Sequence, residues 1–314
     1  MSAHGLVGGV RQRKDSRILV IRLGALGDFV LSFGPFAAIR AHHPDAEITL
    51  LTTAPYAGLA ARAPWFDRVV IDQRPKFHDL PGMVRLIRQL SGFDFVYDLQ
   101  TSGRSSRYFY LAGAPDWNGI ARFSSHPHRA ANRTRLHSIE RQRDQLRVAG
   151  IDDFPAPELD WLKSDLARFA LPERFALLVP GAAPHRPEKR WPAEKFGELA
   201  GILNQSGLPP VIIGTGHEAV DAATIRGLCP QARDLTGQTS IEDIASLAAQ
   251  ADLVIGNDTG PMHLAAATGA RCVVLFGAAS NPALTAPRGT VSVIQAPDLQ
   301  KLELEQVLAA ISTR

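Results

Sequence analysis

Cysteine is nearly absent from this chain: 314 residues include only Cys229 and Cys272. Two cysteines build no disulfide framework, and Cys272 lies in a pattern typical of a buried strand, so we expect free thiols in a reducing compartment. No apolar run approaches the roughly 18 residues that span a bilayer. Residues 1–16 carry basic side chains but no apolar segment, which predicts a flexible tail and not a signal peptide. These absences predict a cytoplasmic protein without a transmembrane segment, able to contact a membrane from inside.

Neither sign of charge is in large excess. Lys and Arg number 34 and Asp and Glu 31, giving a formal net charge of +3, and 45% of the residues are hydrophobic. This mild basicity argues against a dedicated nucleic-acid binder and favours an anionic ligand or a membrane surface as partner. The length is large for one domain and fits two domains of about 150 residues each.

Strand-type and helix-type apolar patterns alternate along the whole chain, which predicts parallel sheets. Strands are predicted at 17–22, 47–52, 68–71, 93–99, 175–179, 210–214, 252–256, 271–276 and 291–295, and helices near 28–42, 55–62, 79–90, 194–206, 217–227, 241–250, 261–268 and 301–311. The Pro-rich segment 154–158 interrupts the alternation. We therefore predict a tail over 1–16 and two Rossmann-like α/β domains, over 17–155 and 156–314, whose parallel sheets face a central cleft.

The segment 254–269, VIGNDTGPMHLAAATG, is the most informative part of the sequence. A β-branched run ends in a polar turn, and an Ala-rich segment of high helix propensity follows. Asp258 or Thr259 is suited to cap this helix. The start of a helix that follows a buried strand is a natural phosphate site. Asp258, Thr259 and His263 are side chains that can bind a ribose, a diphosphate or a sugar.

The segment 18–28, ILVIRLGALGD, also leads from a strand through a glycine-bearing turn into a helix. A dinucleotide site requires G-x-G-x-x-G and an acid at the end of the second strand. Here the spacing is G-x-x-G, and the second strand ends without an acid, so both features count against NAD. Asp28 at the edge of the sheet has two interpretations: a cap for its helix, or a general base for a substrate hydroxyl.

With both turns identified, the chain resembles glycosyltransferase family 9, the ADP-heptose:lipopolysaccharide heptosyltransferases. The matching segments are 18–28, 179–182, 188–192 with the sequence EKRWP, and 257–263 with the sequence NDTGPMH. The resemblance implies a GT-B fold that holds the acceptor in the N-terminal domain and the nucleotide-sugar in the C-terminal domain.

The resemblance also assigns residues. It implies that Asp28 is the catalytic base and that Lys189 contacts the donor phosphates and assists the departure of ADP. The donor contacts that it implies are Gly181, Ala182, Lys189, Thr239, Asp258, Thr259, Gly260 and His263, and Gly24 and Gly27 belong to the acceptor side. Several members of the family carry hydroxyl residues in the turn after Val179, where this chain has GAAP and backbone N–H groups would have to replace them.

Two further groups of residues have a structural and a functional interpretation. Glu218 follows a strand end, where it either contacts the ribose of the donor or belongs to an ordinary polar loop. The Arg-rich segment 122–147 is either a solvated face or a docking surface for an anionic acceptor, such as a phosphorylated or Kdo-bearing lipid A core. In the second interpretation Arg122 binds the acceptor, and Arg104 and Arg107 extend this surface.

The sequence contains no D-x-D triplet, the metal-binding signature of the other large glycosyltransferase fold. We therefore expect catalysis without a metal or another cofactor, with the ADP-sugar as co-substrate. A single base and no evident nucleophile predict single displacement with inversion of the anomeric centre.

The leading hypothesis is thus an inverting, metal-independent heptosyltransferase that acts on a lipopolysaccharide inner-core acceptor. Its partners would be a nucleotide-sugar and an anionic glycolipid at the cytoplasmic face of the inner membrane, and not a nucleic acid. The alternatives are a family 9 relative with another nucleotide-sugar or a protein acceptor, and a non-catalytic relative that binds nucleotide-sugar or lipid. An NAD-dependent oxidoreductase is disfavoured by the first turn.

Overall fold

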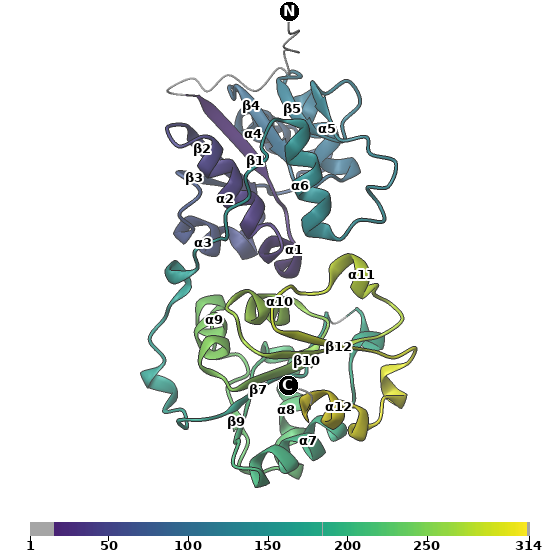
Figure 1. The fold of residues 1–314 in the computed structure, drawn as a ribbon. Helices are drawn as coiled ribbons and strands as arrows, with labels where there is room; N and C mark the ends of the chain where they lie inside the picture. The colour runs from purple at the N-terminus through teal and green to yellow at the C-terminus, as the bar shows by residue number, and fades with distance from the viewer. Residues whose placement is uncertain (1–15, 184, 313–314) are drawn as a thin grey trace, which may run out of the picture. The chain divides into compact units, whose positions relative to one another are not determined.

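The chain forms two compact units that divide between Trp161 and Leu162 (Figure 1). The structure is a computed structural model that describes residues 16–183 and 185–312. The sequence analysis placed the boundary after residue 155, within the stretch that precedes Trp161. Its predicted tail over 1–16 lies, apart from Ser16, outside the described residues.

The first unit contains a six-stranded sheet in the order β3-β2-β1-β4-β5-β6, in which every pairing is parallel. The strands are β1 (Arg17–Ile21), β2 (Glu47–Thr52), β3 (Arg68–Ile71), β4 (Phe95–Asp98), β5 (Asp116–Gly119) and β6 (His126–Pro127). This is the order of a doubly wound sheet, in which the direction of winding reverses between β1 and β4. Ligands of such sheets bind at this switch point, beyond the carboxyl ends of the strands.

Helices cover both faces of this sheet (Figure 1). They are α1 (Leu26–Val30), α2 (Phe33–His42), α3 (Ala54–Arg62), α4 (Leu80–Leu90), α5 (Gly103–Leu111) and α6 (Ser138–Val148). Helices α4 and α5 pack on one face, where Leu86, Leu90 and Phe109 join the buried cluster of Leu19 and Ile21. Helices α2 and α6 contact each other on the opposite face.

The prediction of one helix over residues 28–42 is wrong, because α1 ends at Val30 and α2 begins at Phe33. The hydroxyl of Ser32 donates to the carbonyl of Asp28 at 2.9 Å, which competes with the regular helical bonds. Pro35 has no N–H to donate one turn back, so it suits the first turn of a new helix.

The second unit repeats this topology, with the strand order β12-β11-β10-β7-β8-β9 and parallel pairings throughout. The strands are β7 (Ala176–Val179), β8 (Pro210–Ile212), β9 (Arg233–Asp234), β10 (Leu253–Asn257), β11 (Cys272–Phe276) and β12 (Val291–Gln295). From β7 the chain adds β8 and β9 on one side of the sheet, and then β10, β11 and β12 on the other side. The switch point of this unit therefore lies between β7 and β10.

The helices of the second unit are α7 (Ala193–Gln205), α8 (Ala219–Leu228), α9 (Ile241–Gln250), α10 (Gly260–Ala267), α11 (Pro282–Thr285) and α12 (Leu304–Ser312). Short 3-10 turns lie at Asp160–Leu162, Ala167–Phe169, Pro187–Lys189, Gly216–Glu218 and Leu299–Lys301. Successive strand residues point to opposite faces of the sheet, so Leu177 and Leu178 belong to different core clusters. Helices α7, α8 and α12 pack on the face of Leu178, and α9 and α10 pack on the face of Leu177. Cys229 and Cys272 are buried and unpaired, as predicted. Within the described ranges, no helix is long and apolar enough to cross a bilayer.

Candidate functional site

Two loops meet at the switch point of the second unit, and the fully buried Asn257 at the end of β10 joins them. Its Oδ1 accepts the backbone N–H of Trp191 at 3.0 Å, and its Nδ2 donates to the carbonyl of Pro180 at 2.6 Å. Asn257 thus ties the loop after β7 to the turn Pro187–Lys189. The sequence analysis assigned no role to Asn257, although an amide at the end of an apolar strand is a detectable signal.

Lys189, Asp258 and His263 form a charged cluster at this point. The Nζ of Lys189 donates to Oδ2 of Asp258 at 2.7 Å, and the Nε2 of His263 lies 3.9 Å from Oδ1 of the same carboxylate. The Asp258 side chain is only 8% exposed. Burial by itself would raise its pKa, but the nearby polar groups of His263, Lys189 and Ser280, with the charge of Lys189, lower the pKa to about 2. Asp258 is therefore charged at any physiological pH.

The indole of Trp191 fixes the turn that carries Lys189. Trp191 is 1% exposed, donates from Nε1 to the carbonyl of Leu302 at 2.9 Å and packs against Phe196 at 4.9 Å between ring centroids. Arg186 pairs with Glu188 at 2.6 Å in the same turn. Trp191 thus anchors the turn that presents Lys189 in the core of the second unit.

Helix α10 begins at Gly260 with Thr259 in the N-cap position, but no side chain caps it. Thr259 is the N-cap residue, as one of the two predicted candidates, but neither candidate supplies a side-chain capping hydrogen bond, because Asp258 pairs with Lys189 and the Thr259 hydroxyl makes no hydrogen bond within the described chain. The buried Nδ1 of His263 also has no partner among the described residues. Pro261 has no N–H and Met262 donates its N–H to the carbonyl of Thr259 at 3.1 Å, so in this turn the N–H of Gly260 is free within the described residues. This N–H, the Thr259 hydroxyl and the Lys189 ammonium, which has three donors, are suited to bind an anion with further hydrogen-bonding groups.

The predicted residues Gly181, Ala182 and Glu218 lie together beside this cluster. A Cβ on Gly181 would lie 2.8 Å from Cγ of Glu218, so a larger residue there would displace the Glu218 side chain. Arg190 donates to the carbonyl of Ala182 at 2.8 Å and lies 3.3 Å from the Glu218 carboxylate. Glu218 also accepts from the N–H and hydroxyl of Thr215 at 2.8 and 2.6 Å, so its contacts in this structure are internal to the loops. Its contact with a donor stays a prediction.

Thr239, the remaining predicted donor contact, lies half-buried in the loop between β9 and α9. Its predicted place against the adenine stays a prediction.

At the switch point of the first unit, Arg22 holds Asp28. Arg22 is 4% exposed and donates to the carbonyls of Asp28 at 2.8 Å and of Leu99 at 2.7 Å. Its Nη2 also lies 3.2 Å from Oδ1 of Asp28, whose side chain is 45% exposed. Asp28 does not cap α1, whose N-cap is Ala25, so the capping interpretation is wrong. The sequence analysis missed Arg22, which is a buried cation at the end of an apolar strand.

Gly24 is required by the shape of the first turn. Its φ is +112°, and a Cβ there would overlap the ring of Tyr56. The neighbouring Leu23 is held by its N–H, which donates to Gln100 at 2.8 Å. Gly27 is buried within α1. Gly24 therefore shapes the turn before Asp28, and the contact of either glycine with an acceptor stays a prediction.

Asp98 ends β4 beside this turn and is fully buried. Its Oδ1 accepts the N–H of Thr101 at 3.0 Å, while its Oδ2 has no partner among the described residues. Burial raises the pKa of Asp98 to about 7, against the lowering effect of its hydrogen bonds and of Arg22. This carboxyl therefore titrates near neutral pH.

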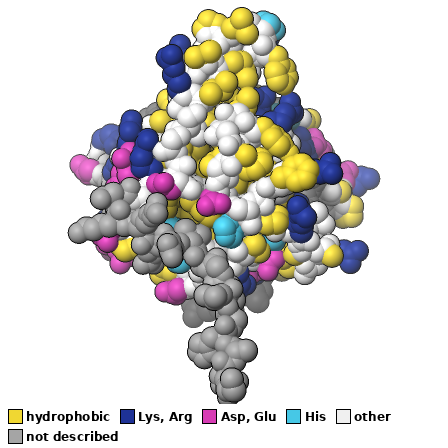
Figure 2. Space-filling model, turned by 90° about the horizontal axis from the view of Figure 1, so that it is seen from above, with side chains coloured by type: hydrophobic (Ala, Val, Ile, Leu, Met, Phe, Trp, Pro, Cys, Tyr) yellow, Lys and Arg dark blue, Asp and Glu magenta, His cyan; other side chains and the backbone are white. Residues whose placement is uncertain are grey.

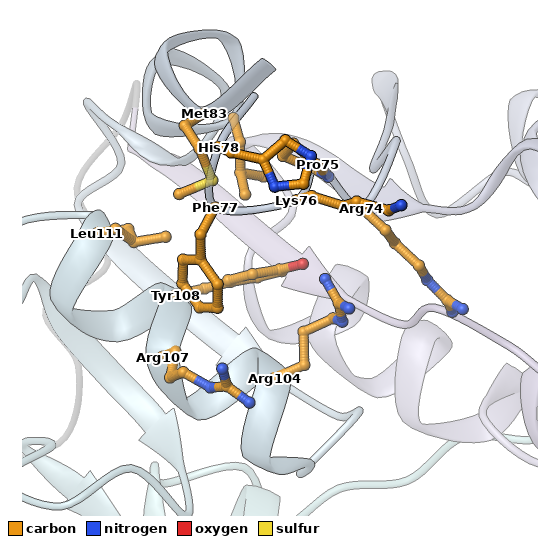
Figure 3. A pocket seen from close by; sticks show the side chains of 11 residues that line it. Arg74, Pro75, Lys76, Phe77, His78, Met83, Arg104, Arg107, Tyr108 and Leu111 are labelled. Atoms are coloured by element: carbon orange, nitrogen blue, oxygen red, sulfur yellow. The ribbon is translucent and has the colours of Figure 1, made fainter. Parts of the chain in front are cut away.

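A cavity of about 320 Å³ in the first unit brings Arg104 and Arg107 together (Figure 3). Its lining residues are Arg74, Pro75, Lys76, Phe77, His78, Met83, Leu86, Arg104, Arg107, Tyr108 and Leu111. Arg104 points toward the hydroxyl of Tyr108, which donates to Asp72 at 2.7 Å. The cavity combines several cations with an apolar wall, so it fits an anion attached to an apolar group.

The sequence analysis missed the loop 74–78, although its basic and aromatic residues follow a predicted strand end. Arg122 is not part of the cavity lining: it is exposed, with its guanidinium 4.8 Å from the ring centroid of Phe123.

The Arg-rich segment 122–147 does not form one uniform charged face. His128 is buried against Asp144 at 2.8 Å. Arg143 and Arg147 lie over the ring of Phe154, at 5.6 and 5.3 Å from its centroid. These three side chains thus contact other parts of the chain and do not simply face solvent. In the part of the chain that the structure describes, no three His, Cys, Asp or Glu side chains form a metal-binding group.

The chain is similar to known proteins over most of its length. The family model described as Glycosyltransferase family 9 (heptosyltransferase) matches residues 83–306. Lipopolysaccharide heptosyltransferase 2 of Escherichia coli (strain K12) is 27% identical over 303 residues, covering 86% of this chain and 85% of the relative.

Two solved structures share the fold. The glycosyl transferase family 9 protein from Veillonella parvula DSM 2008 aligns with a TM-score of 0.80 at 22% identity, over 96% of this chain and 97% of that one. The E. coli heptosyltransferase WaaC with ADP-2-deoxy-2-fluoro heptose aligns with a TM-score of 0.73 at 22% identity, over 94% and 98%. The predicted GT-B fold class, with two Rossmann-like units built on parallel sheets, is confirmed.

Proposed function

Because the chain belongs to glycosyltransferase family 9 (heptosyltransferase), we propose that it transfers a heptose from ADP-heptose to the inner core of lipopolysaccharide. The family makes it a glycosyltransferase, and the names of its relatives support the finer assignment. The relative in E. coli is named a lipopolysaccharide heptosyltransferase, and the similar WaaC structure carries an ADP-heptose analogue. The observation that carries the proposal is the cluster of Lys189, Asp258 and His263 at the start of α10.

The second unit binds the donor in this proposal. The ammonium of Lys189 and the free N–H of Gly260 at the start of α10 are suited to the diphosphate, since both present positive charge without a metal ion. Asp258 keeps Lys189 in place, and the free Thr259 hydroxyl and His263 Nδ1 are suited to sugar hydroxyls or phosphate oxygens. The loop Gly181–Ala182 contributes backbone groups.

Asp28 of the first unit is the general base of the proposed reaction. It accepts the proton of the acceptor hydroxyl while that oxygen attacks the anomeric carbon. Because Arg22 occupies Oδ1 and the side chain is 45% exposed, Oδ2 is accessible to an acceptor. General-base assistance of this kind contributes about 10²–10⁴-fold to the rate.

The bond to ADP breaks on the opposite side of the anomeric carbon, so single displacement inverts its configuration. The transition state resembles an oxocarbenium ion, and negative charge develops on the departing diphosphate. A fixed donor aimed at such charge contributes roughly 3–4 kcal/mol. Lys189 and the α10 N-terminus serve this purpose, and the proposal requires no metal ion.

The basic cavity of the first unit is suited to the acceptor. Arg74, Lys76, Arg104 and Arg107 supply cations for phosphate or carboxylate groups, and Arg pairs with both through two parallel hydrogen bonds. Arg74 also donates to the carbonyl of Leu23 at 3.3 Å, which links the cavity to the turn that carries Asp28. An acceptor lipid at the cytoplasmic face of the inner membrane presents these anionic groups.

The test is an assay of the purified protein with ADP-heptose, with and without a Kdo-bearing lipid A acceptor. We expect ADP release that depends on the acceptor, and a product with the inverted anomeric configuration by NMR. Parallel reactions with other nucleotide-sugars test the alternative donors. Tight ADP binding without acceptor-dependent turnover on any donor would instead indicate the non-catalytic alternative.

A further inference from the structure

Helix α4 of the first unit has a second apolar face that no part of the described chain covers. Leu80, Val84 and Ile87 are 69%, 47% and 37% exposed and follow one another at helical spacing. Leu86 and Leu90 on the inner side are buried in the sheet core. Water-exposed apolar stripes of this kind on a helix mark interaction surfaces.

Basic side chains border this stripe. Arg85 and Arg88 are exposed and make no ion pair with an acidic side chain in the described ranges; Arg85 donates only to the neutral Gln73, at 2.9 Å. The nearest acids along the chain are Asp79 and Asp94. Asp79 accepts the N–H of Gly82 at 3.0 Å as the cap of α4, and Asp94 accepts the N–H of Arg17 at 2.8 Å. Figure 2 shows hydrophobic side chains and Lys and Arg side chains next to one another on the face that it draws.

We propose that this α4 outer face, defined as Leu80, Val84, Ile87, Arg85 and Arg88, docks on a bilayer that contains anionic phospholipid. A helix with an apolar stripe and a basic border lies in the plane of such an interface, where acyl chains take up the stripe and head groups pair with the arginines.

A second copy of the chain fits this face poorly. A symmetric dimer would bring the same patch of both copies together, so the interface would hold Arg85 and Arg88 twice without an acidic side chain of the patch to pair with them. Like charges in that arrangement repel. The charge of the face thus favours the lipid surface as occupant.

The basic cavity lies against the same helix, since Met83 and Leu86 line it (Figure 3). Phe77 at the cavity is 78% exposed and lies three residues before the first residue of α4. Docking of α4 would hold this cavity near lipid head groups, where the acceptor of the proposed function resides. This consequence rests on the proposed function, whereas binding of α4 to lipid does not.

The experiment is sedimentation of the full chain with vesicles, in the absence of donor and acceptor. Vesicles of phosphatidylethanolamine and phosphatidylglycerol are compared with vesicles of phosphatidylcholine alone. We expect the chain to bind the anionic vesicles, and Leu80→Ser with Val84→Ser to weaken this binding roughly tenfold or more, since two large apolar groups no longer enter the interface. Arg85→Gln and Arg88→Gln should each weaken it about fivefold and make it less sensitive to salt.

Matched controls come from α8 of the second unit. Val220 is 76% exposed and Arg226 is exposed, so Val220→Ser and Arg226→Gln change the same kinds of side chain elsewhere. Both controls should bind vesicles like the wild type. The proposal would be overturned if the Leu80/Val84 variant bound vesicles as well as the wild type, or if the wild type did not bind them. It would also be overturned if sedimentation velocity showed a dimer of the wild type that this variant no longer forms.

The vesicle assay and the transfer assay separate the two claims. None of the substituted residues lines the cavity or the donor site, so turnover of a water-soluble, deacylated acceptor should persist in the variants. Loss of vesicle binding with normal turnover of the soluble acceptor supports the docking face. Vesicle binding without any transfer would contradict the proposed function alone.

Discussion

Replacing Lys189 with alanine tests the donor site at its central contact. In the unliganded protein this ammonium neutralises Asp258, whose side chain is 8% exposed, at 2.7 Å. In the proposed complex it also faces the diphosphate. The substitution therefore removes a cation from the ligand and leaves a buried anion beside it.

The size of the effect follows from these contacts. A hydrogen bond to a charged group contributes about 1.5–3 kcal/mol, and each 1.4 kcal/mol is tenfold in affinity, so ADP should bind roughly 10- to 150-fold more weakly. Repulsion from the unpaired Asp258 favours the upper end of this range.

The fold should lose stability as well. The pKa of Asp258 lies at about 2 instead of its ordinary 3.8, so its partners together stabilise the folded state by about 2 kcal/mol above pH 4. This stabilisation is lost as the pH falls from 3.8 through 2. Because Lys189 is one of several partners, Lys189→Ala should lower the free energy of unfolding at pH 7 by up to about 2 kcal/mol.

Calorimetric titration with ADP and urea unfolding measure the two effects. Lys195→Ala is the matched control, because the Lys195 side chain is 21% exposed, close to the 19% of Lys189, and pairs with Glu303 at 3.1 Å. Lys195 lies on α7 outside the cluster, so its removal should leave ADP affinity unchanged. Wild-type ADP affinity in Lys189→Ala, or an equal loss in Lys195→Ala, would refute the reasoning.

Three further predictions concern the first unit. Arg22→Lys should lower kcat and leave ADP affinity intact in steady-state kinetics and calorimetry, since a lysine cannot hold the carbonyls of Asp28 and Leu99 together; weaker ADP binding would contradict a role confined to Asp28. Gly24→Ala should cost about 1–3 kcal/mol in urea unfolding, because φ is +112° there, and an unchanged midpoint would show that the turn adapts. The pKa of Asp98 is about 7 in the folded protein and ordinarily 3.8, so between pH 3.8 and 7 the folded state keeps a proton that the unfolded state has lost. The free energy of unfolding should therefore fall by about 4 kcal/mol as pH rises across this range. Asp98→Asn should remove that slope, and identical pH profiles for wild type and variant would disprove it.

The sequence predicted strands best where β-branched runs are bounded by turns. Glu47–Thr52, Arg68–Ile71 and Val291–Gln295 have the predicted limits. Helix α6 was not predicted because its apolar periodicity is weak. Its buried side carries Gln142 and Gln145, which donate hydrogen bonds to backbone carbonyls. Such polar burial depends on tertiary partners that a local pattern does not contain.

The candidate site was predictable where it follows a strand end. Lys189, Asp258 and His263 were identified from two short motifs and a family resemblance, and the structure places them within one cluster. The ion pair between Lys189 and Asp258 could not be predicted, because the two residues are 69 positions apart and come together only at the switch point of the folded sheet. Arg22 was missed for the same reason, since its partner carbonyls lie on two different segments.

The most direct test of the proposed heptosyltransferase reaction is ADP release by Asp28→Ala and by wild type, with ADP-heptose and a Kdo-bearing lipid A acceptor. The wild type should release ADP only when the acceptor is present. The variant should turn over about 10²–10⁴-fold more slowly, because it lacks the base, while binding ADP with wild-type affinity. Normal turnover by Asp28→Ala, or no acceptor-dependent release by the wild type, would contradict the account.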